Sequence, residues 1–274
     1  MWSDLPAPWN PTAADPGLLP EFNKSEDRHA HCCHIDLLAG ALGWLSAIAA
    51  ASFLVAWVLT SRLGVRRTPY IGALALLTGG LTWGYLAWSD TSLTSFAANH
   101  WGWGLVGAAA AGALLAWLSR HQPRGPRPQG WRLAAALGWE GVVYGSTEGL
   151  LLSVLPVLVT WQAFAAHGWT GGIGKPLVAG IVAMGASLAV IVIHHLGYRG
   201  FHNRAALAPV MVGCGLLSLA YLLTASPLAA VGGHILLHTG LNLRGTEMPP
   251  YGTGGTHIVP LGHQRPAATT ARTT

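Results

Sequence analysis

Charge is what this sequence has least of. Only 9% of its 274 residues are charged, against about 25% in soluble domains, and 51% are hydrophobic. This composition excludes an ordinary soluble globular protein. It also argues against a nucleic-acid partner, because the arginines lie in short loops and form no single basic face. Apolar runs of about 20 residues, enough to cross about 30 Å of hydrocarbon as a helix, recur along the chain.

Cysteine is scarce as well, and its placement excludes a disulfide framework. Of the three cysteines, Cys32 and Cys33 are adjacent and Cys214 lies inside a hydrophobic run. The first residues lack the apolar stretch of a secretory signal peptide, and residues 1–35 are interpreted as a polar N-terminal tail. Residues 36–244 are expected to form a transmembrane helical domain, and residues 245–274 a disordered cytoplasmic tail.

Seven apolar segments predict an all-α fold, a polytopic transmembrane helical bundle of about seven spans. They cover about 37–60, 70–89, 101–119, 133–162, 177–198, 206–224 and 227–243. When the connecting segments are assigned to alternate sides, one side holds 12 of the 15 lysines and arginines. By the positive-inside rule the N-terminus is outside and the C-terminus cytoplasmic. We therefore expect an integral protein of the cytoplasmic membrane, with the lipid bilayer as its surroundings.

Two carboxylates, Glu140 and Glu148, lie inside the fourth apolar segment. An ionised side chain in hydrocarbon costs at least about 2.5 kcal/mol, so such residues normally face inward and have partners. Polar residues recur at every fourth position on two of the expected helices, and therefore line one face of each. These are Glu140, Tyr144 and Glu148 on the fourth segment, and His234, His238 and Asn242 on the seventh.

Depth in the bilayer suggests how these residues are grouped. At 1.5 Å per residue from the cytoplasmic ends, Glu140 lies about 10 Å deep, His238 about 9 Å and Glu148 about 22 Å. The fifth segment ends close to His195, near the same side. We therefore expect Glu140 to share a site with His195 and His238. Glu148 is expected to be a deeper polar contact whose partner is His234.

Several kinds of chemistry fit a carboxylate beside two imidazoles. The carboxylate can act as a general base on a water molecule, with histidine and asparagine stabilising an oxyanion. The same groups can bind a metal ion, and the histidine pair of the seventh segment is a candidate for haem ligation. A buried hydrogen-bond network that only holds the helices together is the structural alternative.

The polar residues resemble the motifs of the CPBP family, the intramembrane glutamate proteases that include CAAX prenyl endopeptidases and bacteriocin-processing or self-immunity proteins. That family carries Glu-Glu-x-x-x-Arg, Phe-x-x-x-His and His-x-x-x-Asn on separate helices. The third motif is present here as His238 to Asn242, and the second is half present, ending at His195 with isoleucine in place of phenylalanine. In the first, Trp139, Glu140 and Tyr144 stand at the Glu, Glu and Arg positions.

The resemblance covers about residues 133–243 and implies a peptidase acting on a hydrophobic membrane peptide or a prenylated peptide, with no cofactor required. Trp139 stands where the family has its water-activating Glu, so the catalytic base is expected to be Glu140, with Glu148 as the alternative. The resemblance implies His195 and His238 as the groups that hold the water, and Asn242 as an oxyanion ligand. Residues expected around them are Tyr144, Glu148, His194 and His234. Two alternatives remain open: a non-catalytic scaffold or self-immunity-type binding protein, and a protein that binds zinc or haem through its histidines.

A separate group of potential metal ligands directly precedes the first span. It consists of His29, His31, Cys32, Cys33 and His34. Cysteine and histidine suit Zn or Cu, whereas structural zinc sites normally use separated ligand pairs. The alternative is a solvated tail beside the membrane.

Overall fold

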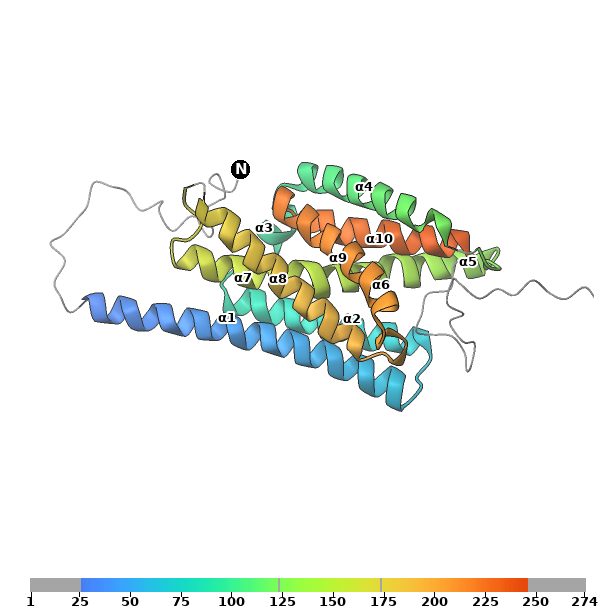
Figure 1. Cartoon of the computed structure of the whole chain (residues 1–274), viewed down its shortest axis with the longest axis horizontal. Helices are drawn as coiled ribbons and strands as arrows, with labels where there is room; N and C mark the ends of the chain where they lie inside the picture. The colour runs from blue at the N-terminus through green and yellow to red at the C-terminus, as the bar shows by residue number, and fades with distance from the viewer. Residues whose placement is uncertain (1–25, 123, 173, 246–274) are drawn as a thin grey trace, which may run out of the picture.

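The chain folds into an all-α bundle, as the apolar runs predict. A computed structural model describes residues 26–122, 124–172 and 174–245, with side chains from residue 38 onward, and these residues contain no strand. Most of the long helices run roughly along the long axis of the bundle, and others cross it obliquely (Figure 1). The candidate ligands at residues 29–34 lie in a described helix, but their side chains are outside the described part, so that site stays a prediction.

Each of the seven predicted segments corresponds to a helix. They are α1 (Glu26–Ala56) with a π-helical continuation at Trp57–Arg62, α2 (Arg67–Trp88), α4 (Trp101–Leu118), a long composite helix, α8 (Gly174–Leu196), α9 (Arg204–Thr224) and α10 (Pro227–Arg244). The short pieces are α3 (Leu93–Ala98) and 3-10 turns at Ser119–His121 and Arg199–Phe201. Helix α1 begins at Glu26, inside the stretch that was interpreted as a polar tail.

The composite helix, called the central helix below, runs without a break from Trp131 to Ala166. It consists of α5 (Trp131–Ala136), a π-helical stretch Leu137–Val143, α6 (Tyr144–Glu148), a second π-helical stretch Gly149–Val154 and α7 (Leu155–Ala166). In its most apolar window 78% of residues are buried, against 22–33% in the five other candidate spans. π-helical turns are rare in proteins, and those that occur are often found at functional sites. The middle of this helix is therefore the natural place for a site.

Six helices are long and apolar enough to cross a membrane: α1, α2, α4, the central helix, α8 and α9. Their outer faces carry large apolar side chains such as Leu76, Ile181 and Leu223, which are 81%, 63% and 63% exposed. Such surfaces suit lipid and are costly in water. The chain is therefore an integral membrane protein.

Helix α10 is not among these six, because two histidines, an asparagine and an arginine lower its hydropathy. It packs against α4, α9 and the central helix (Figure 1). Three glycines at every fourth position bring the central helix close to it, since a Cβ at each would lie 2.7–2.8 Å from atoms of α10. They are Gly141, Gly145 and Gly149. Small-residue stripes permit such close approach of helices in membranes.

The arginine-rich connections gather at one end of the bundle, the right-hand end in Figure 1, which we call the basic end. Helix α2 begins there at Arg67, and α10 ends there at Arg244. The Arg244 guanidinium donates a hydrogen bond to the carbonyl of Arg120, 2.6 Å away, which joins the end of α10 to the end of α4. The central helix also begins at this end.

Candidate functional site

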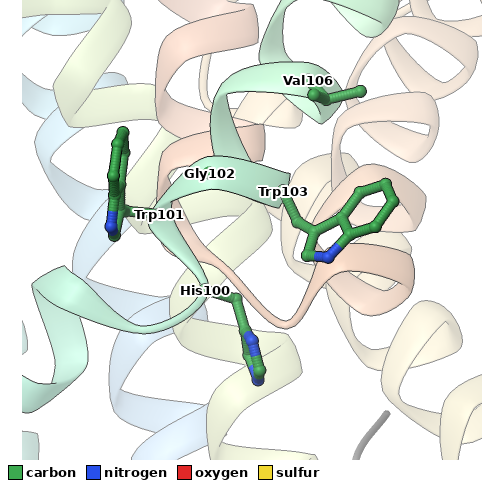
Figure 2. Close-up of a pocket in the computed structure, with 5 residues that line it drawn as sticks. All are labelled: His100, Trp101, Gly102, Trp103 and Val106. Atoms are coloured by element: carbon green, nitrogen blue, oxygen red, sulfur yellow. The ribbon is translucent and has the colours of Figure 1, made fainter.

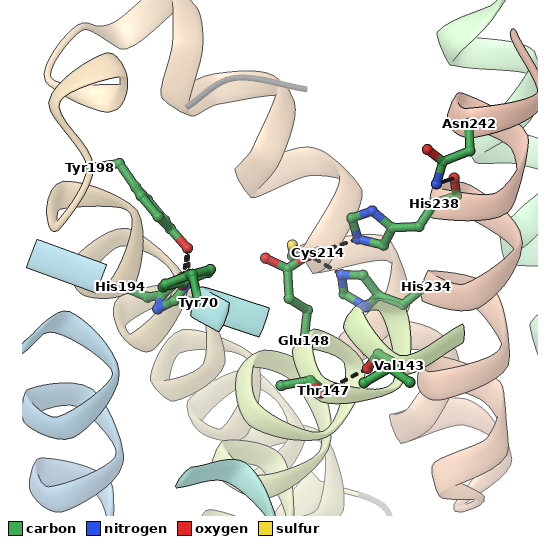
Figure 3. A network of polar contacts seen from close by, with 10 residues as sticks. All are labelled: Tyr70, Val143, Thr147, Glu148, His194, Tyr198, Cys214, His234, His238 and Asn242. Atoms are coloured by element: carbon green, nitrogen blue, oxygen red, sulfur yellow. Dashed lines mark hydrogen bonds and ion pairs between the residues drawn. The ribbon is translucent and has the colours of Figure 1, made fainter. Parts of the chain in front are cut away.

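Glu148 lies at the centre of the polar groups of the bundle. It ends α6, directly before the second π-helical stretch, and is 6% exposed. Its Oε2 atom lies 2.8 Å from Nε2 of His238 on α10 (Figure 3). Because an isolated carboxylate in this setting would be costly, the contact with His238 supplies the partner that burial demands.

Helix α10 presents two histidines to this carboxylate. The rings of His234 and His238 stack with centroids 5.8 Å apart and planes 12° apart. One nitrogen of each ring and one oxygen of Glu148 all lie within 4.8 Å of one another. The Nδ1 atoms of both histidines are buried and have no hydrogen-bond partner among the described residues. The sulfur of Cys214, on α9, lies 3.8 Å from Nε2 of His234.

Helix α8 presents a second histidine pair to the same carboxylate. His194 and His195 each bring a nitrogen within 4.8 Å of a Glu148 oxygen. In His195, Nδ1 is held by the carbonyl of Ile191 at 2.8 Å, which leaves Nε2 for a ligand. Glu148 therefore lies between histidines of two helices.

His194 differs from its neighbour because both of its ring nitrogens have protein partners. Its Nδ1 lies 3.3 Å from the carbonyl of Ser52 on α1, and its Nε2 lies 3.1 Å from the Tyr198 hydroxyl. Tyr198 in turn forms a hydrogen bond with Tyr70 of α2. Figure 3 shows this chain on the side of Glu148 opposite His238. His194 thus links the site to α1 and α2.

The grouping expected from depth is wrong for Glu140, whereas the expected proximity of Glu148 to His234 is found. Glu140 lies with Arg67, the Oε2 and Nη1 atoms being 2.8 Å apart, whereas Glu148 lies with His195 and His238. The reason is that the central helix extends beyond its neighbours at the basic end, where none of residues 131–140 is buried. Counting residues from the helix end therefore placed Glu140 too deep in the bundle.

Asn242 and Tyr144 both lie next to His238. The Nδ2 atom of Asn242 donates to the carbonyl of His238 on its own helix, at 3.1 Å. The Tyr144 ring meets the His238 ring edge to face at 4.8 Å between centroids. Asn242 is therefore held by its own helix, and Tyr144 fixes the orientation of His238.

Four groups around the site were not singled out from the sequence: Arg67, Tyr70, Tyr198 and Cys214. Tyr198 follows His194 by four positions, a spacing that signals contact within one helical turn. Arg67 was counted only as a topology signal. Nothing in the sequence relates Cys214 or Tyr70 to the histidines, because their contacts depend on how separate helices pack.

A pocket of about 340 Å³ lies elsewhere, at the start of α4 (Figure 2). It is lined by His100, Trp101, Gly102, Trp103 and Val106. Two of these are tryptophans more than half exposed, as is usual where a membrane helix meets the interface. The pocket contains none of the histidines around Glu148.

No family model, no curated protein and no solved structure matches this chain. The similarity to the CPBP motifs therefore stays a prediction. The function must be argued from the buried glutamate and histidines themselves.

Proposed function

We propose that this chain is a membrane-embedded metalloprotein whose centre holds one transition-metal ion, with Zn²⁺ as the first candidate. The observation that carries the proposal is the convergence of Glu148, His234 and His238, all buried, with one ligand atom of each within 4.8 Å of the other two.

The ligand types and spacings suit this ion. Zinc binds imidazole nitrogen and carboxylate oxygen at about 2.0–2.2 Å in tetrahedral geometry, which places two ligand atoms about 3.3 Å apart. The closest pair here, on Glu148 and His238, is 2.8 Å apart. Three protein ligands leave a fourth position open, as in catalytic zinc sites. His195, on the other side of Glu148, is placed to hold the carboxylate rather than the ion.

His194 fits a supporting role in this arrangement. Its ring nitrogens are bound to Ser52 and Tyr198, so it is poorly placed to give up a nitrogen to the ion. Groups around a metal site orient its ligands and tune their basicity. His194 thus positions Glu148 and His195 relative to α1 and α2.

The test is the metal content of the purified protein. The chain is extracted in mild detergent, exposed to Zn²⁺, freed of loose metal and analysed by elemental mass spectrometry. We expect about one ion per chain in the wild type and little in His234→Ala and His238→Ala, because each variant removes a ligand. His167→Ala is the matched control, since His167 bonds to the carbonyl of Ala163 in its own helix, away from Glu148.

Two results would refute the metal proposal. One is a wild type that stays metal-free after exposure to zinc, copper, iron and manganese. The other is equal metal content in the wild type and the two histidine variants. A visible spectrum of the same samples examines the haem alternative, because a haem ligated by His238 would give a Soret band that His238→Ala abolishes.

Hydrolysis is the second candidate function, supported by the contact between Glu148 and His238. A carboxylate hydrogen-bonded to an imidazole is a suitable general base for activating water. Glu148 then takes the role that the CPBP resemblance gave to Glu140, and the substrate is a hydrophobic or prenylated peptide. Glu148→Gln should abolish cleavage of such a peptide in proteoliposomes, whereas Glu140→Gln should leave it.

Chelation separates the two candidates. Loss of cleavage on metal removal, restored by Zn²⁺, makes hydrolysis the activity of the metal centre. Cleavage that persists without metal supports a glutamate mechanism. If the metal-loaded protein cleaves no membrane peptide, the hydrolase proposal is refuted and the metal-binding proposal stands.

We also infer that the basic end faces the cytoplasm, because it holds the excess of arginines. Labelling of a single cysteine placed at Arg124 should occur only from the cytoplasmic side. Labelling from outside would reverse the orientation.

A further inference from the structure

We propose that the ion pair of Arg67 and Glu140 is the gate through which the metal ion enters and leaves the buried centre, with the Glu140 carboxylate as its first, transient ligand. This inference rests on the proposed metal centre. It gives a role to the second membrane glutamate, which the centre itself does not use.

An unbroken series of side-chain contacts joins the two glutamates. Glu140 lies 2.8 Å from Arg67, and the Arg67 guanidinium carbon lies 5.7 Å from the centre of the Tyr144 ring. The Tyr144 ring lies 4.8 Å from that of His238, whose Nε2 contacts Glu148. The Tyr144 ring is therefore the one side chain that separates Arg67 from the proposed ligand His238.

This series reaches the surface at the ion pair. The side chains of Arg67 and Glu140 are 19% and 24% exposed, whereas Tyr144 is 5% exposed. Carboxylate and other polar groups that follow one another towards the interior reduce the cost of moving a cation into an apolar bundle. The pair is thus the point at which a cation can leave water.

Two other directions from Glu148 are closed by buried side chains. Beyond it on the central helix lie apolar side chains that are fully buried, including Leu151, Leu152 and Leu155. Towards α1, His194 and Ser52 are also fully buried. A bare cation in an apolar interior costs many kcal/mol, so these directions are poor routes for exchange.

The chemistry of the pair suits a gate for a cation. A carboxylate binds divalent ions, but the Glu140 carboxylate is occupied by the Arg67 guanidinium. An arriving ion must displace Arg67, and the guanidinium then swings away from a charge of its own sign. Once the ion has moved inward, Arg67 returns and opposes the approach of a second cation. The pair therefore slows exchange in both directions.

The experiment measures exchange rates separately from metal content. Protein loaded with Co²⁺, whose absorption reports its ligands, is mixed with excess EDTA, and release is followed by stopped flow. Uptake is followed by adding Co²⁺ to the stripped protein. We expect Arg67→Ala to speed release and uptake by about tenfold, the effect of breaking a partly buried charged hydrogen bond. Glu140→Gln should slow uptake several-fold at low Co²⁺, because it removes the first ligand.

Both variants should bind as much Co²⁺ at equilibrium as the wild type. Arg66→Ala is the control, because Arg66 is an exposed neighbour that lacks the contact with Glu140. If Arg67→Ala does not fold, Arg67→Lys still tests the gate, since it weakens the pair with little change in volume and should speed exchange, and Glu140→Gln still tests the first ligand. Unchanged rates in folded variants that bind Co²⁺ would refute the gate and leave the centre intact. A wild type that binds no metal would refute both.

Discussion

Glu140 and Glu148 are the same residue type, eight positions apart on one helix, yet their surroundings differ in almost every respect. Glu140 lies where the central helix leaves the bundle, is about a quarter exposed and faces a permanent cation, Arg67. Glu148 lies between two π-helical stretches, is almost fully buried and faces the histidines of α8 and α10. An arginine already neutralises the first carboxylate, whereas the second lies among imidazoles, which can bind a metal ion together with it.

The comparison teaches that the role of a membrane carboxylate follows from its partners as well as from its burial. A guanidinium donates hydrogen bonds and can accept none, so Arg67 neutralises the Glu140 carboxylate but cannot itself bind a cation. Imidazoles are both donors and metal ligands, so the group around Glu148 has unused binding capacity.

Exchanging each carboxylate for its amide should give the largest contrast. Glu148→Gln should lose the bound metal at equilibrium, because an amide is a much weaker ligand than a carboxylate. Glu140→Gln should keep the wild-type metal content. Elemental analysis of the two variants, prepared in parallel, measures the difference. Equal losses in both would remove the distinction between the two glutamates.

A methyl group at Gly145 should damage the site through packing. A Cβ there would lie 2.8 Å from Cα of Ile235, so Gly145→Ala must push α10 away from Glu148. We expect a loss of about 1–3 kcal/mol in unfolding free energy, as for overpacked cores, together with weaker metal binding. Gly138→Ala in the same helix meets no atom within 4 Å and is the control. Thermal unfolding in detergent and metal titration measure both effects.

Removing the hydroxyl that holds His194 should give the smallest effect. Tyr198→Phe breaks the contacts with His194 and Tyr70 but leaves the proposed ligands in place. We expect affinity for Zn²⁺ to fall about tenfold, the lower end of the range for groups that support metal ligands. Competition with a chelating dye measures the change. An affinity that matches the wild type would make the chain from His194 to Tyr70 a packing feature only.

Most of the fold could be predicted because apolar runs in this chain are long and clearly separated. All seven segments are helices, including α10, whose polar residues exclude it from the spans recognised by hydropathy. The short helix Leu93–Ala98 was missed because six residues give too little periodicity. The π-helical stretches were also missed, since their residues carry no pattern that separates them from an α-helix.

The members of the site could be predicted, but the way they are grouped could not. Spacing by four correctly brought Tyr144 and His238 into the set, and their rings are in contact. Depth, in contrast, depends on where each helix begins relative to its neighbours. The exposed first part of the central helix placed Glu140 at the rim, which no count along the sequence could reveal. The contact of Cys214 with His234 likewise arises only from the packing of α9 against α10.

The central claim is that Glu148, His234 and His238 hold a metal ion inside the bundle. Its most direct test is an experimental structure of the zinc-loaded protein, with X-ray data collected on both sides of the zinc absorption edge. The account predicts an anomalous peak about 2.0–2.2 Å from an oxygen of Glu148 and from a nitrogen of each histidine. Protein that contains one zinc ion per chain but shows no anomalous peak among these residues would contradict it.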